Sequence, residues 1–128
     1  MVCAFTGHRP QRLPWGTNEQ DPRCAALKQV LAETVKRVVE RGTRTFLCGM
    51  ARGCDTYFAE AVLEQMERDP ALELVAMIPC PEQSARWPRA DRERYERLLS
   101  CCTSVEVLEP TYSRGSMLRR NRVMVERA

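Results

Sequence analysis

The sequence has little of what marks membrane and secreted proteins. No apolar run in its 128 residues approaches the roughly 20 residues that a membrane-spanning helix needs. The start, MVCAFTGHRP, lacks the basic segment and the long apolar segment of a signal peptide. We therefore expect no contact with a membrane, a cytoplasmic location, and one domain that spans residues 1–128.

Paired cysteines and clustered histidines are also missing. The seven cysteines are an odd number, no two of them have C-x-x-C spacing, and His8 is the only histidine. We expect neither a disulfide framework nor a metal site, and no cofactor. Cys54 falls at the start of a predicted helix, where the helix dipole can stabilise a thiolate. The alternative, which we favour, is a cysteine that packs in the core.

The excess of positive charge is small, because 20 basic residues face 17 acidic ones, for a net charge of +3. Such a balance does not by itself indicate a nucleic-acid-binding protein. Residues 114–127, however, hold five arginines and one acidic residue, Glu126. This segment is either a basic face that attracts phosphate or a solvated helix face.

What the sequence does contain is a regular alternation of strand and helix patterns. Apolar runs predict strands, and periodic segments that begin at signals such as Asp21-Pro22 predict helices. The predicted strands are 2–6, 43–48, 72–79 and 103–110; the predicted helices are 22–40, 54–68, 87–102 and 116 onward. This order predicts an α/β fold, with a parallel sheet of at least four strands between layers of helices.

Parallel strands place every strand-to-helix loop at one edge of the sheet. The loops TGHRP, GMARG, PCPEQ and PTYSRG should therefore lie together. Open α/β sheets bind ligands at this edge, where the order of the strands reverses. We expect the functional residues in these loops.

The stretch GMARGCD, residues 49–55, carries the clearest chemistry. Gly49 and Gly53 let the backbone approach a ligand, and Arg52 offers a planar donor for phosphate. Asp55 stands in the first helical turn, where it can cap the helix or accept from a ribose hydroxyl. The spacing fits neither a Walker A loop nor G-x-G-x-x-G. We favour a phosphate site over a plain turn.

The first loop adds Gly7, His8 and Arg9. Gly7 frees the turn, Arg9 is a second candidate for phosphate, and His8 has no evident partner that would make it a general base. Trp15 either stacks on a base or covers the core, and we favour the core.

The third and fourth loops supply polar and aromatic groups. Glu82 and Gln83 carry the hydrogen-bonding groups that a base or a ribose requires, and Tyr112 can stack on a base. Arg120 and Asn121 follow one turn into the last helix. The alternative for this helix is simple amphipathicity. Four apolar residues would then face inward: Met117, Leu118, Met124 and Val125.

Taken together, TGHRP, LPWG, GMARGCD, PCPEQ…W and YSRG-x-M-x-x-RNR-x-MV resemble the YpsA-like family of the SLOG superfamily. The resemblance runs from Cys3 to about Arg127. It implies a Rossmann-like fold that binds a nucleotide or a nucleotide-derived ligand, as a sensor rather than as an enzyme. The site residues that it implies are Gly7, His8, Arg9, Gly49, Arg52, Gly53, Asp55, Glu82, Gln83, Tyr112, Arg120 and Asn121.

The sequence departs from that family at its C-terminal end. Similar domains continue into a further strand and a glycine-rich turn, whereas this chain stops at Ala128 inside a helical pattern. We expect a shortened domain, and an exposed sheet edge that favours a homo-oligomer.

Two other functions stay open. Enzymes of the LOG type split nucleoside monophosphates, but their P-G-G-x-G-T-x-x-E signature is absent here. If the protein nevertheless had such hydrolase activity, Glu82 or Asp55 would have to act as the acid or base. Relatives of the DprA type bind single-stranded nucleic acid, which the arginines of 114–127 favour and the small net charge does not.

Overall fold

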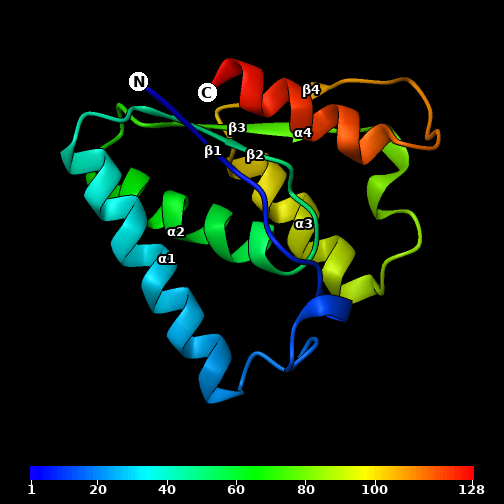
Figure 1. The fold of residues 1–128 in the computed structure, drawn as a ribbon, viewed down its shortest axis with the longest axis horizontal. Helices are drawn as coiled ribbons and strands as arrows, with labels where there is room; N and C mark the ends of the chain where they lie inside the picture. The colour runs from blue at the N-terminus through cyan, green and yellow to red at the C-terminus, as the bar shows by residue number, and fades with distance from the viewer.

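A computed structural model describes all residues from Met1 to Ala128, and it contains one four-stranded sheet. Its strands are β1 (Val2–Phe5), β2 (Thr45–Cys48), β3 (Glu73–Ile78) and β4 (Ser104–Val107), which lie side by side in chain order (Figure 1). All three pairings are parallel. The predicted α/β fold with a parallel sheet is confirmed.

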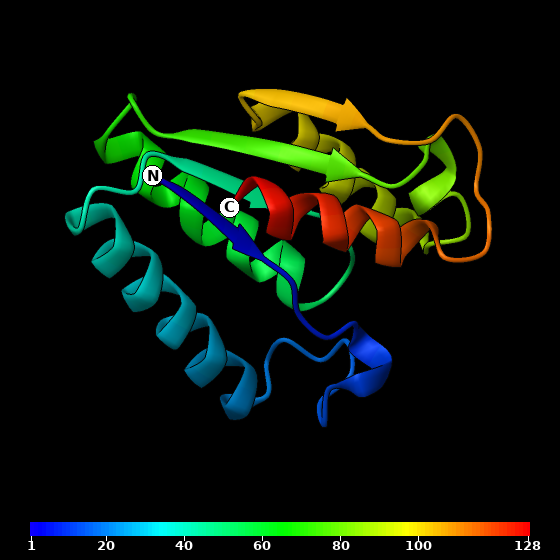
Figure 2. The same ribbon diagram turned by 45° about the horizontal axis from the view of Figure 1, so that its top comes forward.

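The helices cover the two faces of the sheet unequally. Three of them, α1 (Pro22–Glu40), α2 (Cys54–Arg68) and α3 (Arg89–Cys101), lie on one face, and α4 (Ser116–Arg127) lies alone on the other (Figures 1 and 2). This follows from right-handed crossovers between neighbouring strands that succeed one another in chain order. No helix is both long and apolar enough to cross a membrane.

The order of the strands does not reverse within this sheet, so the reversal that we expected beside the ligand site is not found among these four strands. The chain instead changes from one face to the other between α3 and α4. Figure 2 shows the strand arrows pointing toward the same side of the molecule. The strand-to-helix loops therefore still share one edge.

The hydrophobic core has two parts, one on each face of the sheet. The larger part lies under α1–α3 and includes Phe46, Leu74, Phe58 and Val62. The smaller part lies under α4 and consists of Leu47, Val75, Met77 and Met124. The helical layer of three thus contributes most of the apolar burial that stabilises the fold.

The sequence signals at the start of α1 work as predicted. The Asp21 carboxylate accepts a hydrogen bond from the backbone N–H of Arg23 at 2.8 Å, and Pro22 stands in the first turn. Trp15 packs against the apolar cluster of Cys24, Leu31 and Tyr57, as predicted.

The predicted inner face of α4 is partly wrong. Met124 is buried, but Leu118 and Val125 are 74% and 69% exposed. Arg120 is buried in their place. Residues 117, 120 and 124 follow the helical repeat that faces the sheet, and 118 and 125 point away from it. A buried arginine breaks the apolar pattern from which the face was predicted.

Candidate functional site

The loop after β2 is fixed from the opposite layer by Arg120. The Arg120 guanidinium donates from Nη1 to the carbonyl oxygens of Gly49 at 2.8 Å and Met77 at 3.3 Å. Its Nε donates to the side chain of Asn121 at 2.8 Å. A side chain at position 49 would overlap the guanidinium, so the glycine is required there by Arg120. The structure thus gives Arg120 and Asn121 partners within the protein.

Gln83 joins the same group of contacts from the third loop. It stands in a short 3-10 helix, η2 (Pro81–Ser84), and its side chain is buried. Its Nε2 donates to the Gly49 carbonyl at 3.2 Å and to the Tyr95 hydroxyl at 3.4 Å. Its Oε1 has no partner. The second loop, the third loop and helix α4 therefore meet at the Gly49 peptide.

The first and second loops pack directly against each other. The carbonyl oxygen of His8 accepts from the backbone N–H of Cys54 at 3.1 Å. Gly53 has a φ of 85°, and a Cβ there would come within 2.7 Å of the same oxygen. A Cβ at Gly7 would lie 2.6 Å from the Cβ of Cys54. Both glycines are needed for close packing of the two loops.

The side chains of His8 and Cys54 differ in exposure. His8 is exposed, and its backbone rather than its imidazole makes the contact with the second loop. Cys54 is buried, and this burial raises the pKa of its thiol. Cys54 is therefore a packing residue, as we favoured, and not an activated thiolate.

Asp55 is a buried carboxylate in the first turn of α2. Its Oδ2 accepts from the backbone N–H of Ala51 at 3.1 Å, while Oδ1 has no partner. Burial raises its pKa to about 6, against the hydrogen bond from Ala51 and the charge of Arg120. Asp55 thus closes the loop that precedes the helix. The sequence predicted a polar role for it, but not that its carboxylate would be removed from solvent.

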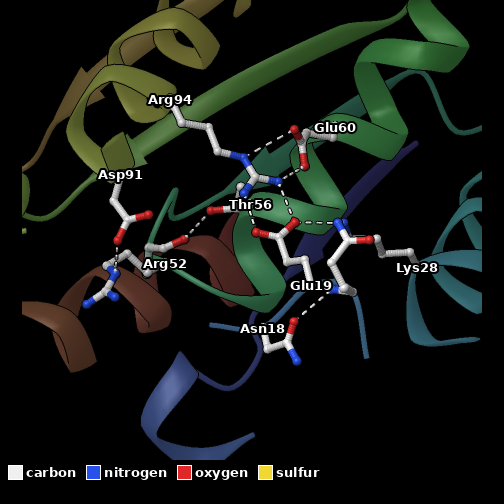
Figure 3. Close-up of polar contacts among 10 residues, drawn as sticks. Asn18, Glu19, Lys28, Arg52, Thr56, Glu60, Asp91 and Arg94 are labelled. Atoms are coloured by element: carbon white, nitrogen blue, oxygen red, sulfur yellow. Dashed lines mark hydrogen bonds and ion pairs between the residues drawn. The ribbon is translucent and has the colours of Figure 1, made fainter. Parts of the chain in front are cut away.

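Arg52 is half-buried and forms an ion pair with Asp91 of α3, with 3.0 Å between Nε and Oδ2. In Figure 3 the outer nitrogens of Arg52 point away from Asp91. Arg52 and Arg9 line a pocket of about 180 Å³. No carboxylate lines this pocket; the other residues around it are Pro10, Gln11, Ala51, Trp87 and Met117. We call it the arginine pocket.

A second and larger pocket of about 430 Å³ adjoins it at Trp87 and Met117. It is lined by Glu82, Gln83, Ala85, Arg86 and Tyr112 together with those two residues. Tyr112 is 64% exposed, and Glu82 is exposed as well. We call it the tyrosine pocket.

Trp87, between the third loop and α3, has more than one role. It does pack, edge-on against Tyr95 with 5.0 Å between ring centroids. It also lines both pockets and a third, smaller one of about 50 Å³ behind Arg52. The signal in the sequence was the aromatic residue at the end of the third loop, which was not among the predicted site residues.

The predicted site residues share one edge of the sheet but not one hollow. Arg9 and Arg52 line the arginine pocket, and Glu82, Gln83 and Tyr112 line the tyrosine pocket. The other predicted residues hold the loops through their backbone or through buried side chains: Gly7, His8, Gly49, Gly53, Asp55, Arg120 and Asn121.

A group of ion pairs beside the site had no signal in the sequence. Figure 3 shows Arg94 of α3 between Glu60 of α2 and Glu19 of the loop before α1, and Glu19 also pairs with Lys28. Hydrogen bonds that Arg94 donates to the Glu19 carboxylate lower the pKa of Glu19 to about 2. Glu19 and Arg94 are 75 positions apart, so their meeting depends on the tertiary fold.

The parallel sheet, with four loops at one edge and pockets among those loops, defines a Rossmann-like α/β protein. The family model described as the YspA SLOG family, YpsA, matches residues 3–128. The chain therefore belongs to the YpsA family of the SLOG superfamily. Membership of this family suggests a role related to nucleotides.

Relatives among well-curated proteins agree with this assignment. The chain is 32% identical to a UPF0398 protein of Bacillus pumilus over 131 residues, which cover 98% of this chain and 68% of that protein. A UPF0398 protein of Bacillus licheniformis is 27% identical over 99% of this chain and 70% of its own length. One of Bacillus cereus is 30% identical over 82% of this chain and 56% of its own length.

Proposed function

We propose that the protein binds a phosphorylated nucleoside, or a related nucleotide-derived ligand, at the carboxyl edge of its sheet, and that it acts as a sensor rather than as an enzyme. The observation that carries the proposal is the arginine pocket. Arg9 and Arg52 come from two different loops, and they line one pocket that no carboxylate lines. Two guanidinium groups in one lining favour an anion, and the acidic partner of Arg52, Asp91, lies outside that lining.

The ion pair with Asp91 supports this role for Arg52. Asp91 contacts Nε and thereby holds the guanidinium in place, while the outer nitrogens point elsewhere. Those nitrogens are the pair that engages a phosphate in a bidentate manner. Arg52 also stands directly before the N-terminus of α2, where the helix dipole favours negative charge.

The test is calorimetric titration with a panel of nucleosides, nucleoside monophosphates and ADP-ribose. We expect at least one phosphorylated member to bind, and Arg52→Ala to weaken it about 10-fold or more. A hydrogen bond to a charged group contributes about 1.5–3 kcal/mol. Arg68→Ala removes an exposed arginine at the C-terminal end of α2, the helix that follows Arg52. This variant should leave the affinity unchanged.

Failure of every phosphorylated compound to bind the wild-type protein would refute the proposal. Equal weakening by Arg52→Ala and Arg68→Ala would refute the assignment of Arg52. A thermal shift measured on the same panel gives an independent readout, since a ligand at 100 times its Kd stabilises the folded state by about 2.7 kcal/mol.

The two alternative functions, a nucleoside-monophosphate hydrolase and a single-stranded nucleic-acid binder, have less support. An enzyme would need an acid or base at the ligand, yet Asp55 lines neither the arginine pocket nor the tyrosine pocket, and Glu82 is exposed. Binding of single-stranded nucleic acid would need the arginines of 114–127 to be free. Arg119 pairs with Glu109, Arg127 pairs with Glu106, and Arg120 is buried.

A further inference from the structure

We infer that the ligand lies in one orientation, with its base in the tyrosine pocket and its phosphate in the arginine pocket. The inference rests on the proposed function and extends it, because it assigns a part of the ligand to each pocket. It starts from the different chemistry of the two linings, which come from different loops of the same edge.

The two pockets differ in charge. The arginine pocket has two cationic side chains and no anionic one. The tyrosine pocket contains one residue of each sign, Glu82 and Arg86, so that its formal charge is balanced. A phosphate is therefore favoured in the first pocket, and an uncharged group is tolerated in the second.

The two pockets also differ in size and in aromatic surface. The tyrosine pocket, at about 430 Å³, falls in the range of about 300–1,000 Å³ that is usual for small-molecule sites, whereas the arginine pocket, at about 180 Å³, is suited to a smaller group. The larger pocket has two aromatic rings in its lining, Tyr112 and Trp87. Aromatic rings stack on bases without needing a particular base.

Tyr112 has no role in the core that would explain an aromatic residue at its position. It is 64% exposed in the loop between β4 and α4, outside the apolar clusters that the two faces of the sheet bury. Trp87, by contrast, is held by its edge-on contact with Tyr95. The pocket thus combines one fixed ring with one exposed ring that can close on a flat ligand.

The junction between the pockets fits the middle of a nucleotide. Trp87 and Met117 line both pockets. A base and a phosphate joined by a ribose would place the sugar against these two residues. A mononucleotide in this orientation contacts the loops after β1, β2, β3 and β4 at once.

The experiment compares three ligands on two variants by calorimetric titration: adenosine, ribose 5-phosphate and adenosine 5′-monophosphate. We expect Tyr112→Ala to weaken adenosine and the monophosphate by about 10-fold, because stacking on one ring contributes about 1–3 kcal/mol per base, and to leave ribose 5-phosphate unchanged. We expect Arg9→Ala to weaken both phosphates and to leave adenosine unchanged.

Matched variants control for indirect effects. Tyr112→Phe keeps the ring and should bind as the wild type does. Arg12→Ala removes a neighbouring exposed arginine that does not line the arginine pocket, and it should have no effect. The indole N–H signals of Trp15 and Trp87 give a second readout, since only that of Trp87 should move when adenosine is added.

The outcomes separate the orientation from the proposed function. If the monophosphate binds, but Tyr112→Ala weakens ribose 5-phosphate or leaves adenosine unchanged, the orientation is overturned and nucleotide binding stands. If the wild-type protein binds none of the phosphorylated compounds, both fail. The orientation is supported if Tyr112→Ala weakens adenosine but not ribose 5-phosphate, and Arg9→Ala weakens ribose 5-phosphate but not adenosine.

Discussion

Asp55 is the one acidic residue that the protein buries. Its carboxylate is 3% exposed, and only one of its oxygens has a partner. The hydrogen bond from Ala51 and the charge of Arg120 compensate only in part for the lost hydration, so the neutral form persists to a higher pH in the folded protein than in the unfolded chain. The native state therefore holds a proton on Asp55 at a pH where the unfolded chain has released it.

This carboxylate predicts a measurable dependence of stability on pH. Burial raises the pKa of Asp55 from 3.8 to about 6, so its contribution is most favourable below pH 4, declines as the pH rises to about 6, and is constant above that. We expect the wild-type protein to lose about 2–3 kcal/mol of unfolding free energy over this window relative to Asp55→Asn. Urea denaturation between pH 4 and pH 7 measures the difference.

A surface carboxylate with a similar hydrogen bond provides the control. Asp69 accepts the backbone N–H of Ala71 at 3.1 Å, as Asp55 accepts that of Ala51. Asp69→Asn should keep the pH dependence of the wild type. Parallel curves for the wild type and Asp55→Asn would show that Asp55 titrates as it does in the unfolded chain.

At the scale of elements, Arg94 joins three segments that are distant in the sequence. It pairs with Glu19 in the loop before α1 and with Glu60 on α2, and it stands on α3 itself (Figure 3). Thr17 and Glu19 of that loop line the small pocket behind Arg52 together with Arg94. The ion pairs therefore hold the loop beside this small pocket.

Removal of Arg94 should loosen this loop. We expect Arg94→Ala to lower the unfolding free energy by about 1–2 kcal/mol at pH 7, since partly exposed pairs are weakened by solvent, and to speed amide hydrogen exchange in residues 16–21 about 10-fold. Because Arg94 lowers the pKa of Glu19 to about 2, the stabilisation is present above pH 4.5 and fades as the pH falls toward 2.

Arg89→Ala is the matched comparison, because it breaks only an exposed pair with Glu93 within α3. It should cost less than about 0.5 kcal/mol and leave exchange in the loop unchanged. An equally small effect of Arg94→Ala would mean that the loop is held by apolar contacts such as those of Trp15.

The elements also show what the sequence could and could not predict. The alternation of strands and helices and the common edge of the loops followed from local patterns and from the topology that they imply. The inner face of α4 did not, because the periodic pattern treats an arginine as a surface residue, and Arg120 is buried. The division of the site into two pockets depends on where the segment before α3 places Trp87, which is a matter of tertiary packing.

For the molecule as a whole, the positive charge is dispersed rather than concentrated. The net charge is +3, and two arginines of the basic segment, Arg119 and Arg127, are paired with glutamates. Non-specific affinity for nucleic acid scales with the number of phosphates that free cationic groups neutralise. Within the basic segment only Arg114 and Arg122 are exposed and without an ion pair, which is few for binding a polyanion.

We therefore expect weak binding to single-stranded DNA. Fluorescence anisotropy with a labelled 30-mer of deoxythymidine at 150 mM salt should give a Kd above about 100 μM, which is at the weak end of non-specific binding. Micromolar binding that falls steeply with salt would instead favour the nucleic-acid function. Nucleotide binding to the same sample under the same salt conditions would confirm that the protein is folded and competent.

The contact between Arg120 and the Gly49 carbonyl constrains how this family can diverge. A Cβ at position 49 would overlap Nη1 of Arg120, so a side chain there would displace the guanidinium. A shorter residue at position 120 would leave the Met77 carbonyl without this donor and the Gly49 carbonyl with Gln83 alone. Each substitution alone therefore disrupts the contact. We expect the two positions to covary among homologues, so that a lineage which loses the glycine has also lost the arginine.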